Sequence, residues 1–173
     1  MERRRIQAIE PSPENVLEAN FHGSFALLAF ITNRHIVDHM VRFRRAFGLD
    51  FEALVLWAVV AHQNTAHLFP PGSLPSVVLN EDGLLKGSDP QLRPLRLRHL
   101  SEITGIPRET TRRKLATLEA AGWIVQTPQG WLLNKDKVGP ELREFTLETV
   151  RRFRAASRDV ERALAAGDGT RRT

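Results

Sequence analysis

Apolar side chains recur at helical spacing along the first fifty residues. Ser12, Pro13 and Glu14 combine a hydroxyl, a proline and an acid, an order typical of a helix start. The apolar positions continue to residue 47, after which Gly48 suits a left-handed helix stop. We therefore predict a long N-terminal helix, which the glycine within residues 22–24 would kink or divide.

Two further long helices are predicted, one directly before a long loop and one near the C-terminus. Asp50 suits the cap of a run from residue 51 to about residue 67, which is apolar nearly all round and therefore predicted to be central and buried. Residues 70–94 are rich in proline and glycine and are predicted to be a loop or insertion. The last helix is expected from residue 141 to about residue 166, opened by Pro140 and ended by Gly167.

The segment between these helices predicts two short helices joined by a turn. Residues 95–97 alternate like a short strand, and residues 98–104 follow as a helix with Leu100 and Ile103 facing inward. Gly105 permits a tight turn, and Ile106 fills the angle between two helices.

The second helix of this pair is expected from Pro107 to about residue 121. Its inward stripe is Thr111, Leu115 and Leu118, which leaves the charged side chains outward. Residues 123–125 and 131–133 then predict two strands joined by a turn at 127–130. With the strand at 95–97 they would form the three-stranded sheet of a winged helix-turn-helix, so the predicted fold class is mainly α with long terminal helices.

Composition narrows the class of protein. The chain of 173 residues is 42% hydrophobic and 26% charged, which is ordinary for a soluble protein, and it has no cysteine. That excludes disulfides and thiolate zinc sites. The longest uncharged apolar stretches, 25–32 and 53–61, are far shorter than the roughly 20 residues that span a bilayer. We expect a cytoplasmic protein without a membrane segment or secretory signal.

Positive charge collects on the predicted helix-turn-helix. Residues 91–125 carry seven Lys and Arg against three Asp and Glu, whereas residues 49–90 carry one against five. A polyanionic partner requires such a surface. A solvated charged face would give the same count, so charge alone does not decide the function.

The outward face of the predicted helix from Pro107 has the chemistry for reading base edges. Arginine can pair bidentately with guanine, and glutamate can accept from the cytosine amino group. Glu109 and Arg113 are four residues apart, in the order that lets each hold the other. The predicted base-reading side chains are Arg108, Glu109, Arg112 and Arg113. Arg112 is also a candidate for phosphate contact.

Residues 105–115, Gly-Ile-Pro-Arg-Glu-Thr-Thr-Arg-Arg-Lys-Leu, precede Leu118-Glu119 and Gly122-Trp123-Ile124. This stretch resembles the recognition helix of the cyclic-AMP receptor and fumarate–nitrate regulator (Crp/Fnr) superfamily. The resemblance covers residues ~95–135 and implies that Arg108, Glu109 and Arg113 read bases while Thr110 touches phosphate. Upstream no cyclic-nucleotide β-roll is predicted. The overall order is loosely similar to that of multiple-antibiotic-resistance-type (MarR) regulators, whose terminal helices wrap around each other in a dimer.

We interpret the chain as a sequence-specific transcriptional regulator that binds double-stranded DNA. The predicted phosphate contacts are Arg96, Arg98, Thr110, Lys114, Thr117 and Gln129. The competing interpretation is a winged-helix protein-interaction module that does not bind DNA.

Other candidate sites are weaker. His35, Asp38 and His39 share a helix face at spacings that suit a metal, but a polar interface or solvent face is favoured, so no metal or cofactor is predicted. Trp123 and Trp131 are expected in the core rather than stacked on bases. Because no phosphate loop, nucleophile elbow or carboxylate pair is present, we do not expect an enzyme.

The terminal helices suggest how the DNA-binding region is presented. Residues 21–47 and 142–160 carry more apolar side chains than a small domain needs to cover its core. We therefore predict a homodimer held by residues near 21–43 and 142–160, which binds an inverted-repeat DNA site. An unknown small-molecule effector is a further candidate partner, which the sequence does not identify. The predicted regions are 1–48 (dimerisation), 49–69 (central helix), 70–94 (insertion), 95–139 (winged helix-turn-helix) and 140–173 (C-terminal helix and tail).

Overall fold

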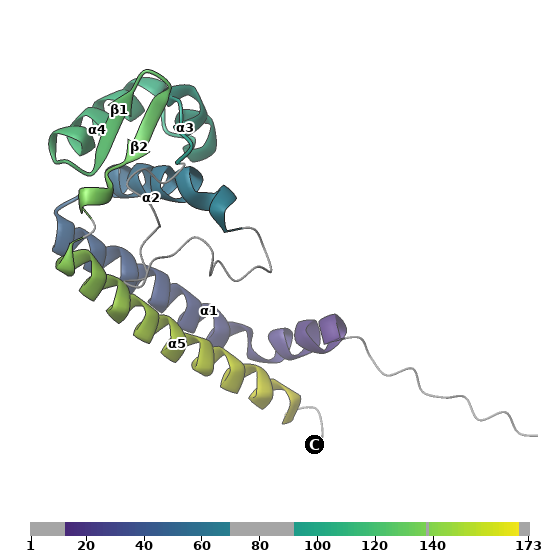
Figure 1. The fold of residues 1–173 in the computed structure, drawn as a ribbon. Helices are drawn as coiled ribbons and strands as arrows, with labels where there is room; N and C mark the ends of the chain where they lie inside the picture. Colours follow the sequence, from purple (N-terminus) through teal and green to yellow (C-terminus); the bar gives the residue numbers. More distant parts are fainter. Residues whose placement is uncertain (1–12, 70–91, 138, 170–173) are drawn as a thin grey trace, which may run out of the picture. The chain divides into compact units, whose positions relative to one another are not determined.

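The computed structural model describes residues 13–69, 92–137 and 139–169 (Figure 1). The predicted cap at Ser12, the predicted tail from residue 170 and nearly all of the predicted insertion lie outside these residues. The described elements are α1 (Pro13–Phe47), α2 (Phe51–Thr65), η1 (Ala66–Leu68), α3 (Leu97–Thr104), α4 (Arg108–Ala120), β1 (Ile124–Thr127), β2 (Gly130–Leu133), η2 (Lys135–Lys137) and α5 (Pro140–Gly169).

These elements belong to two compact units, which we describe separately. The described residues of 1–41 and 146–173 form the helical-pair unit, and the described residues of 42–145 form the winged-helix unit. Among the described residues no single helix is long and apolar enough to cross a membrane, and only residues 20–47 and 51–68 taken as a bent pair reach that length and composition.

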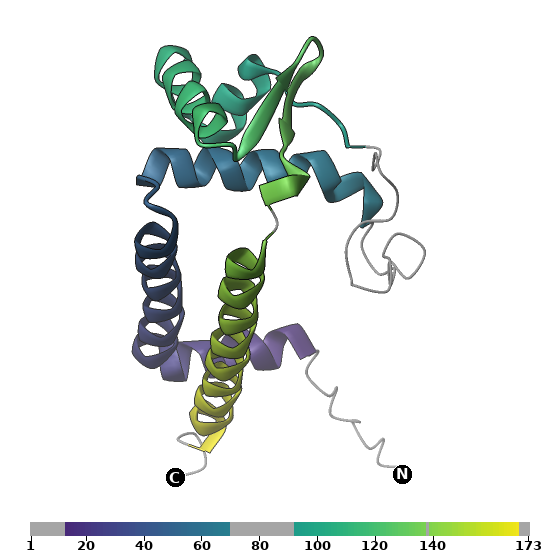
Figure 2. The same ribbon diagram turned by 60° about the vertical axis from the view of Figure 1, so that its left-hand side comes forward.

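The helical-pair unit is an antiparallel pair made by α1 and α5. Leu28 and Ile31 of α1 are buried against Ala163 of α5. The Ser24 hydroxyl donates a hydrogen bond of 2.7 Å to the Ala163 carbonyl. Further along the pair, Arg34 binds Asp159 at 3.2 Å. Small and branched side chains on α5 thus let the two helices lie side by side (Figures 1 and 2).

Both long helices differ in detail from the prediction. The α1 helix is not divided at residues 22–24, although its ribbon changes direction in the N-terminal part (Figure 2). The α5 helix continues through Gly167 to Gly169, so the predicted stop is wrong. One glycine inside a helix costs only about 1 kcal/mol relative to alanine and does not by itself end the helix.

The winged-helix unit is built around α2. Leu56 and Val60 of α2 are fully buried in one core with side chains from α3, α4 and β1, as the prediction of a central helix requires. Figure 2 shows α2 crossing beneath α3, α4 and the β1–β2 hairpin. Trp123 and Trp131 are also buried in this core, which confirms their predicted place.

The predicted end of α1 and start of α2 are also confirmed. The Asp50 side chain accepts a hydrogen bond of 3.0 Å from the Ala53 N–H, so it caps the helix. Gly48 has φ +67°, and its N–H donates to the Arg44 carbonyl at 2.9 Å. A left-handed glycine therefore ends α1 two residues before Asp50 starts α2.

The wing is a two-stranded antiparallel sheet in which Ile124 pairs with Leu133 and Thr127 with Gly130. The predicted third strand is reduced to one bridge, because only Leu95 exchanges hydrogen bonds with Trp131, at 3.0 and 2.9 Å. Arg96 already occupies the N-cap position of α3, so the chain turns away after a single residue. The fold class is confirmed as mainly helical with this smaller wing.

The two helices of the helix-turn-helix meet as predicted, with one exception. Gly105 ends α3 with φ +68°, and Ile106 packs against the core. Ile103, however, is 51% exposed, whereas Leu100 is fully buried. The inward positions beside Leu100 are taken by Ser101 and Thr104, whose hydroxyls donate to the carbonyls of Ile106 and Leu100, both at 2.7 Å. These polar residues hold the turn, so the isoleucine between them faces outward.

Candidate DNA-binding surface

The orientation of α4 about its axis follows from its buried stripe. Thr111, Leu115 and Leu118 are all fully buried, as the spacing predicts. The Thr111 hydroxyl is within 3.2 Å of the carbonyls of Ile106 and Pro107, so this polar member of the stripe is hydrogen-bonded to the preceding turn. The opposite face of α4 is consequently exposed from its first turn, and the predicted base-reading side chains all lie on it: Arg108, Glu109, Arg112 and Arg113.

A bidentate ion pair occupies the middle of this face. The Arg112 Nε lies 3.0 Å from one carboxylate oxygen of Glu109, and an Arg112 terminal nitrogen lies 2.5 Å from the other. The predicted pairing of Glu109 with Arg113 is therefore corrected to a pairing with Arg112, one position nearer. A planar guanidinium fork matches a carboxylate, so the three-residue spacing allows both bonds at once.

This ion pair also fixes charge at neutral pH. The hydrogen bonds that Glu109 accepts from Arg112 lower the pKa of its carboxyl, and this effect exceeds the opposing effect of lost hydration. The same bonds raise the pKa of Arg112. Within the described part of the chain, neither Arg108 nor Arg113 has an ion-pair partner. The exposed face thus offers a preformed carboxylate–guanidinium pair flanked by two arginines that are available to a ligand.

The predicted phosphate-binding residues lie in different environments. Arg96 is exposed at the N-cap position of α3, and Gln129 is exposed in the turn of the wing. Arg98 is exposed too, but its Nε donates to Glu102 at 2.7 Å. Thr110 is half-buried at the start of α4. The exposed Thr117 hydroxyl donates to the Arg113 carbonyl at 3.2 Å.

Lys114 differs most from the prediction. Its Nζ lies 2.6 Å from Asp50 Oδ2 and 3.4 Å from Glu52 Oε2, and its side chain is only 18% exposed. An ammonium held by two carboxylates of α2 is poorly placed to contact a phosphate as well. The ion pair favours a role within the fold, which local spacing could not reveal because Asp50 is 64 residues away.

The wing is attached by a residue that sequence reasoning did not single out. Asn64 of α2 is fully buried, and its amide nitrogen donates to the carbonyls of Arg93 and Trp131 at 2.7 and 3.2 Å. Its amide oxygen accepts from the Leu133 N–H at 2.7 Å. One side chain thus joins α2 to β2 and to the segment before α3. The available signal was helical spacing, because Asn64 continues the buried positions Leu56 and Val60 at intervals of four residues.

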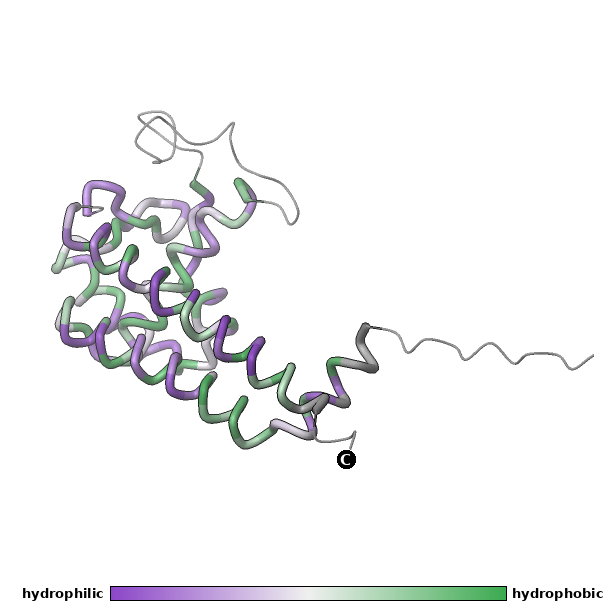
Figure 3. The backbone as a smooth tube through the Cα atoms, turned by 90° about the horizontal axis from the view of Figure 1, so that it is seen from below, coloured by the Kyte–Doolittle hydropathy of each residue, from purple (hydrophilic) through white to green (hydrophobic). Residues whose placement is uncertain are grey.

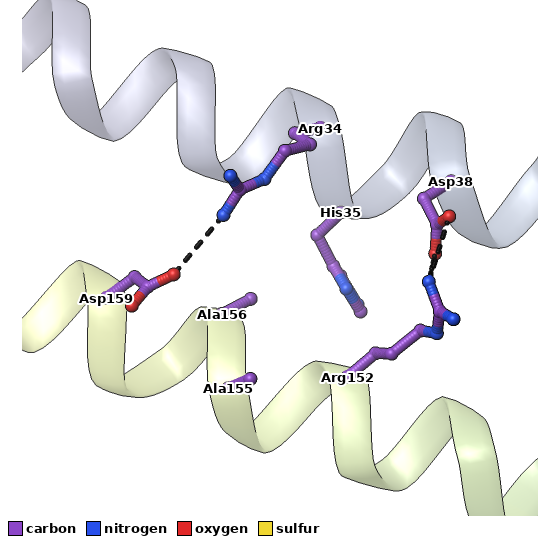
Figure 4. Close-up of a pocket in the computed structure, with 7 residues that line it drawn as sticks. All are labelled: Arg34, His35, Asp38, Arg152, Ala155, Ala156 and Asp159. Carbon is purple, nitrogen blue, oxygen red and sulfur yellow. Dashed lines mark hydrogen bonds and ion pairs between the residues drawn. The ribbon is translucent and has the colours of Figure 1, made fainter.

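The residues of α1 at metal-like spacing were expected at a polar interface or solvent face rather than in a metal site. Among residues 13–69, 92–137 and 139–169, no three His, Cys, Asp or Glu side chains group as a metal site. Asp38 instead binds Arg152 at 3.1 Å, and the His35 ring lies 5.7 Å from that of Phe153. Figure 4 shows His35 between this ion pair and the Arg34–Asp159 pair, in a hollow floored by alanines of α5. These side chains hold α1 to α5.

Comparison with known families identifies the central segment. Residues 89–128 match the IclR helix-turn-helix domain, a domain of winged helix-turn-helix transcriptional regulators. Comparisons with curated proteins and with solved structures gave no match. The matched family is non-enzymatic, in agreement with the expectation from the sequence. The match covers α3, α4 and β1, the elements that present the exposed arginines. The chain therefore carries an IclR-type helix-turn-helix domain and is a DNA-binding transcriptional regulator.

Proposed function

We propose that α4 is the recognition helix and inserts into the major groove of double-stranded DNA. The observation that carries this proposal is the exposed first half of α4, where Arg108 and Arg113 have no ion-pair partner among the described residues. Both are suited to bidentate pairing with guanine. The roles implied by the Crp/Fnr resemblance fall on this same face.

The Glu109–Arg112 pair has a defined part in this proposal. A carboxylate held by a guanidinium is fixed in direction and stays charged, so Glu109 can accept from a cytosine amino group without a loss of side-chain freedom on binding. Arg112 then acts as the residue that orients Glu109. Because Arg112 lies on the same exposed face, it is also placed to contact a base or a phosphate once DNA is bound.

Base reading by Arg113 is tested on DNA selected from random sequence by the full chain. Arg113→Ala should weaken binding to the selected duplex by about 1–3 kcal/mol and relax the preference at one or two base pairs. The control is Arg158→Ala, which removes an exposed arginine of α5 with the same charge. An equal loss on selected and scrambled duplexes would make Arg113 a phosphate contact. A wild-type chain that selects no sequence would favour the protein-interaction alternative.

Phosphate contacts are proposed for the basic and polar side chains around α4. Arg96 is the strongest candidate because it is exposed and unpaired among the described residues, and Arg98 would have to share its guanidinium with Glu102. Thr110, Thr117 and Gln129 would contribute uncharged contacts. Removing Arg96 should lower the dependence of log affinity on log salt by about one unit. An unchanged salt dependence would exclude Arg96 from the phosphate contacts.

We further propose that two copies assemble through the helical-pair unit. Its exposed large apolar side chains are Leu17, Phe21, Phe25, Leu27, Phe30, Ile36, Val37, Val41, Leu147, Val150 and Phe153. At roughly 80–100 Å² each, they expose on the order of 1,000 Å². This total is comparable with the area of about 800 Å² per partner that a stable interface buries. Figure 3 shows how hydrophobic positions recur along these helices.

The spacing on α1 indicates which face pairs. Leu27, Phe30, Arg34, Val37 and Val41 follow one another at intervals of three and four residues, the pattern of a coiled-coil seam. All four apolar members are between 41% and 59% exposed, although Leu28 and Ile31 beside them are buried against α5. The α1 helix therefore has one side occupied by α5 and a second apolar side available to another copy.

Light scattering tests the dimer directly. The full chain should have twice its chain mass of 19.6 kDa at micromolar concentration. Phe30→Glu should shift it to the monomer, because a charge at the seam would be buried without a partner. Asn33→Glu places the same charge at an exposed polar position of α1 and should leave the mass unchanged. A wild-type monomer, with and without DNA, would refute this assembly.

A further inference from the structure

The side chain of Lys114 links the recognition helix to the start of α2. Lys114 follows the exposed Arg113 and precedes the fully buried Leu115, so it leaves α4 at the border between its two faces. From there its ammonium reaches Asp50 at 2.6 Å and Glu52 at 3.4 Å. Both carboxylates belong to the first turn of α2 or its cap. The contact is therefore a lateral connection between two packed helices.

The Asp50 end of this connection is itself fixed. One carboxylate oxygen of Asp50 accepts from the Ala53 N–H at 3.0 Å, and the other takes the Lys114 ammonium. The preceding residue, Leu49, is buried in the core. The hydrogen bond from Lys114 also lowers the pKa of Asp50. Lys114 thus binds a charged group that a helix cap and a buried neighbour hold in place.

We propose that Lys114 and Asp50 form a clasp that restricts the rotation of α4 about its axis more tightly than the buried stripe does alone and so positions the base-reading face. This inference rests on the proposed function of α4. Lys114 is a positioning residue here, since it acts through Arg108 and Arg113 and touches no base. Glu52 supports the same ammonium from the second position of α2.

Small rotations of α4 matter because base reading depends on short contacts. A side-chain group about 6 Å from the helix axis moves by about 1 Å when the helix turns by 10°. Hydrogen-bond lengths vary by only about 0.5 Å, so such a turn would break a bidentate contact. The apolar side chains of Leu115 and Leu118 resist separation of the helices but have no directional bonds. The clasp adds a directional contact at the edge of the stripe.

The competing interpretation is that Lys114 leaves Asp50 and binds a phosphate. The two interpretations predict opposite effects for Asp50. If Lys114 binds a phosphate of the DNA, removing the negative charge of Asp50 should strengthen binding to every duplex. If the clasp positions α4, the same change should weaken binding to the selected duplex only.

The test uses the full chain with Lys114→Met, Asp50→Asn and the double variant. Asparagine caps helices as well as aspartate does, so Asp50→Asn keeps the cap of α2 while removing the nearer of the two charges that hold Lys114. Lys135→Met removes a lysine from the exposed η2 turn and serves as the charge-matched control. Affinities are measured on the selected duplex and on a scrambled duplex over a range of salt concentrations. Tryptophan fluorescence during heating establishes that each variant is folded.

Each single variant should lower the ratio of selected to scrambled affinity about three- to tenfold, in the range of couplings between contacting groups. The double variant should lose no more than the larger single loss, and the salt dependence should not change. A loss by Lys114→Met on both duplexes with a shallower salt dependence would overturn the clasp in favour of a phosphate contact. An unchanged ratio in Asp50→Asn would also overturn it. A wild-type ratio near one would instead refute base reading by α4, which separates the two failures.

Discussion

Replacing Asn64 should destabilise the winged-helix unit more than any exposed substitution on α2. In Asn64→Ala the Arg93 carbonyl and the Leu133 N–H lose their side-chain partner, whereas the Trp131 carbonyl keeps its bond from Leu95. Leaving a buried backbone group unsatisfied costs about 1–3 kcal/mol. With two such groups, of which the Arg93 carbonyl is nearer to solvent, we expect a loss of about 2–4 kcal/mol.

Asn64→Asp separates the donor from the acceptor function of the amide. A carboxylate can still accept from the Leu133 N–H, but it faces the Arg93 and Trp131 carbonyls without a proton to donate. Burial raises the pKa of such a carboxyl, and its protonated form can donate. The destabilisation by this variant should therefore be largest at neutral pH and decrease as the pH falls.

Urea unfolding followed by tryptophan fluorescence measures both variants. The chain has three tryptophans, at positions 57, 123 and 131, and all lie in the winged-helix unit, so the signal reports on that unit. The control is Gln63→Ala, which removes an exposed amide from the residue immediately before Asn64. It should change the free energy of unfolding by no more than about 0.5 kcal/mol. If Asn64→Ala matched this control, the three hydrogen bonds would not hold the wing to α2.

Three further changes test the fold around the site by the same unfolding measurement. Gly130→Ala should lower the free energy of unfolding by about 1–3 kcal/mol, because φ is +144° there and the new methyl would lie 2.7 Å from the Leu95 carbonyl oxygen. An unchanged free energy of unfolding would contradict this close approach. Leu118→Ala should cost about 2–5 kcal/mol through the cavity it leaves in the core, and a smaller loss would indicate collapse of the site. Because the pKa of Asp50 is lowered in the folded chain, its ionised form stabilises the fold at neutral pH, and this stabilisation is lost as the pH falls below the ordinary aspartate pKa of about 4. In Asp50→Asn the free energy of unfolding should no longer show this loss at low pH.

The parts of the fold that follow from local chemistry were predictable. Asp50 caps α2 and Gly105 ends α3, because capping and left-handed backbone depend on one residue and its immediate neighbours. The buried stripe of α4 follows from helical periodicity in the same way. Ile103 was misplaced because a short helix has few inward positions, and residue type alone cannot tell which of them polar residues occupy.

The interactions that organise the candidate site join residues far apart in the sequence. Lys114 and Asp50 are separated by 64 residues, and Asn64 and Leu133 by 69. Helical spacing could place Lys114 on α4 but could not show that another helix supplies its partner. Even the local choice between Arg112 and Arg113 as partner of Glu109 depends on rotamers, since both spacings are favourable on a helix.

These pairings change how strongly DNA binding should depend on salt. Of the seven basic side chains in residues 91–125, three are held by carboxylates: Arg98, Arg112 and Lys114. The others are Arg93, Arg96, Arg108 and Arg113, and even if all four met phosphate the slope of log affinity against log salt would reach only about −3.6 per copy. Base reading by Arg108 and Arg113 would make it shallower. If the slope were steeper than this limit, with the copy number known from light scattering, and Lys114→Met made it shallower, Lys114 would exchange its carboxylates for phosphate when DNA binds. The clasp of Lys114 would then be a feature of the free protein alone.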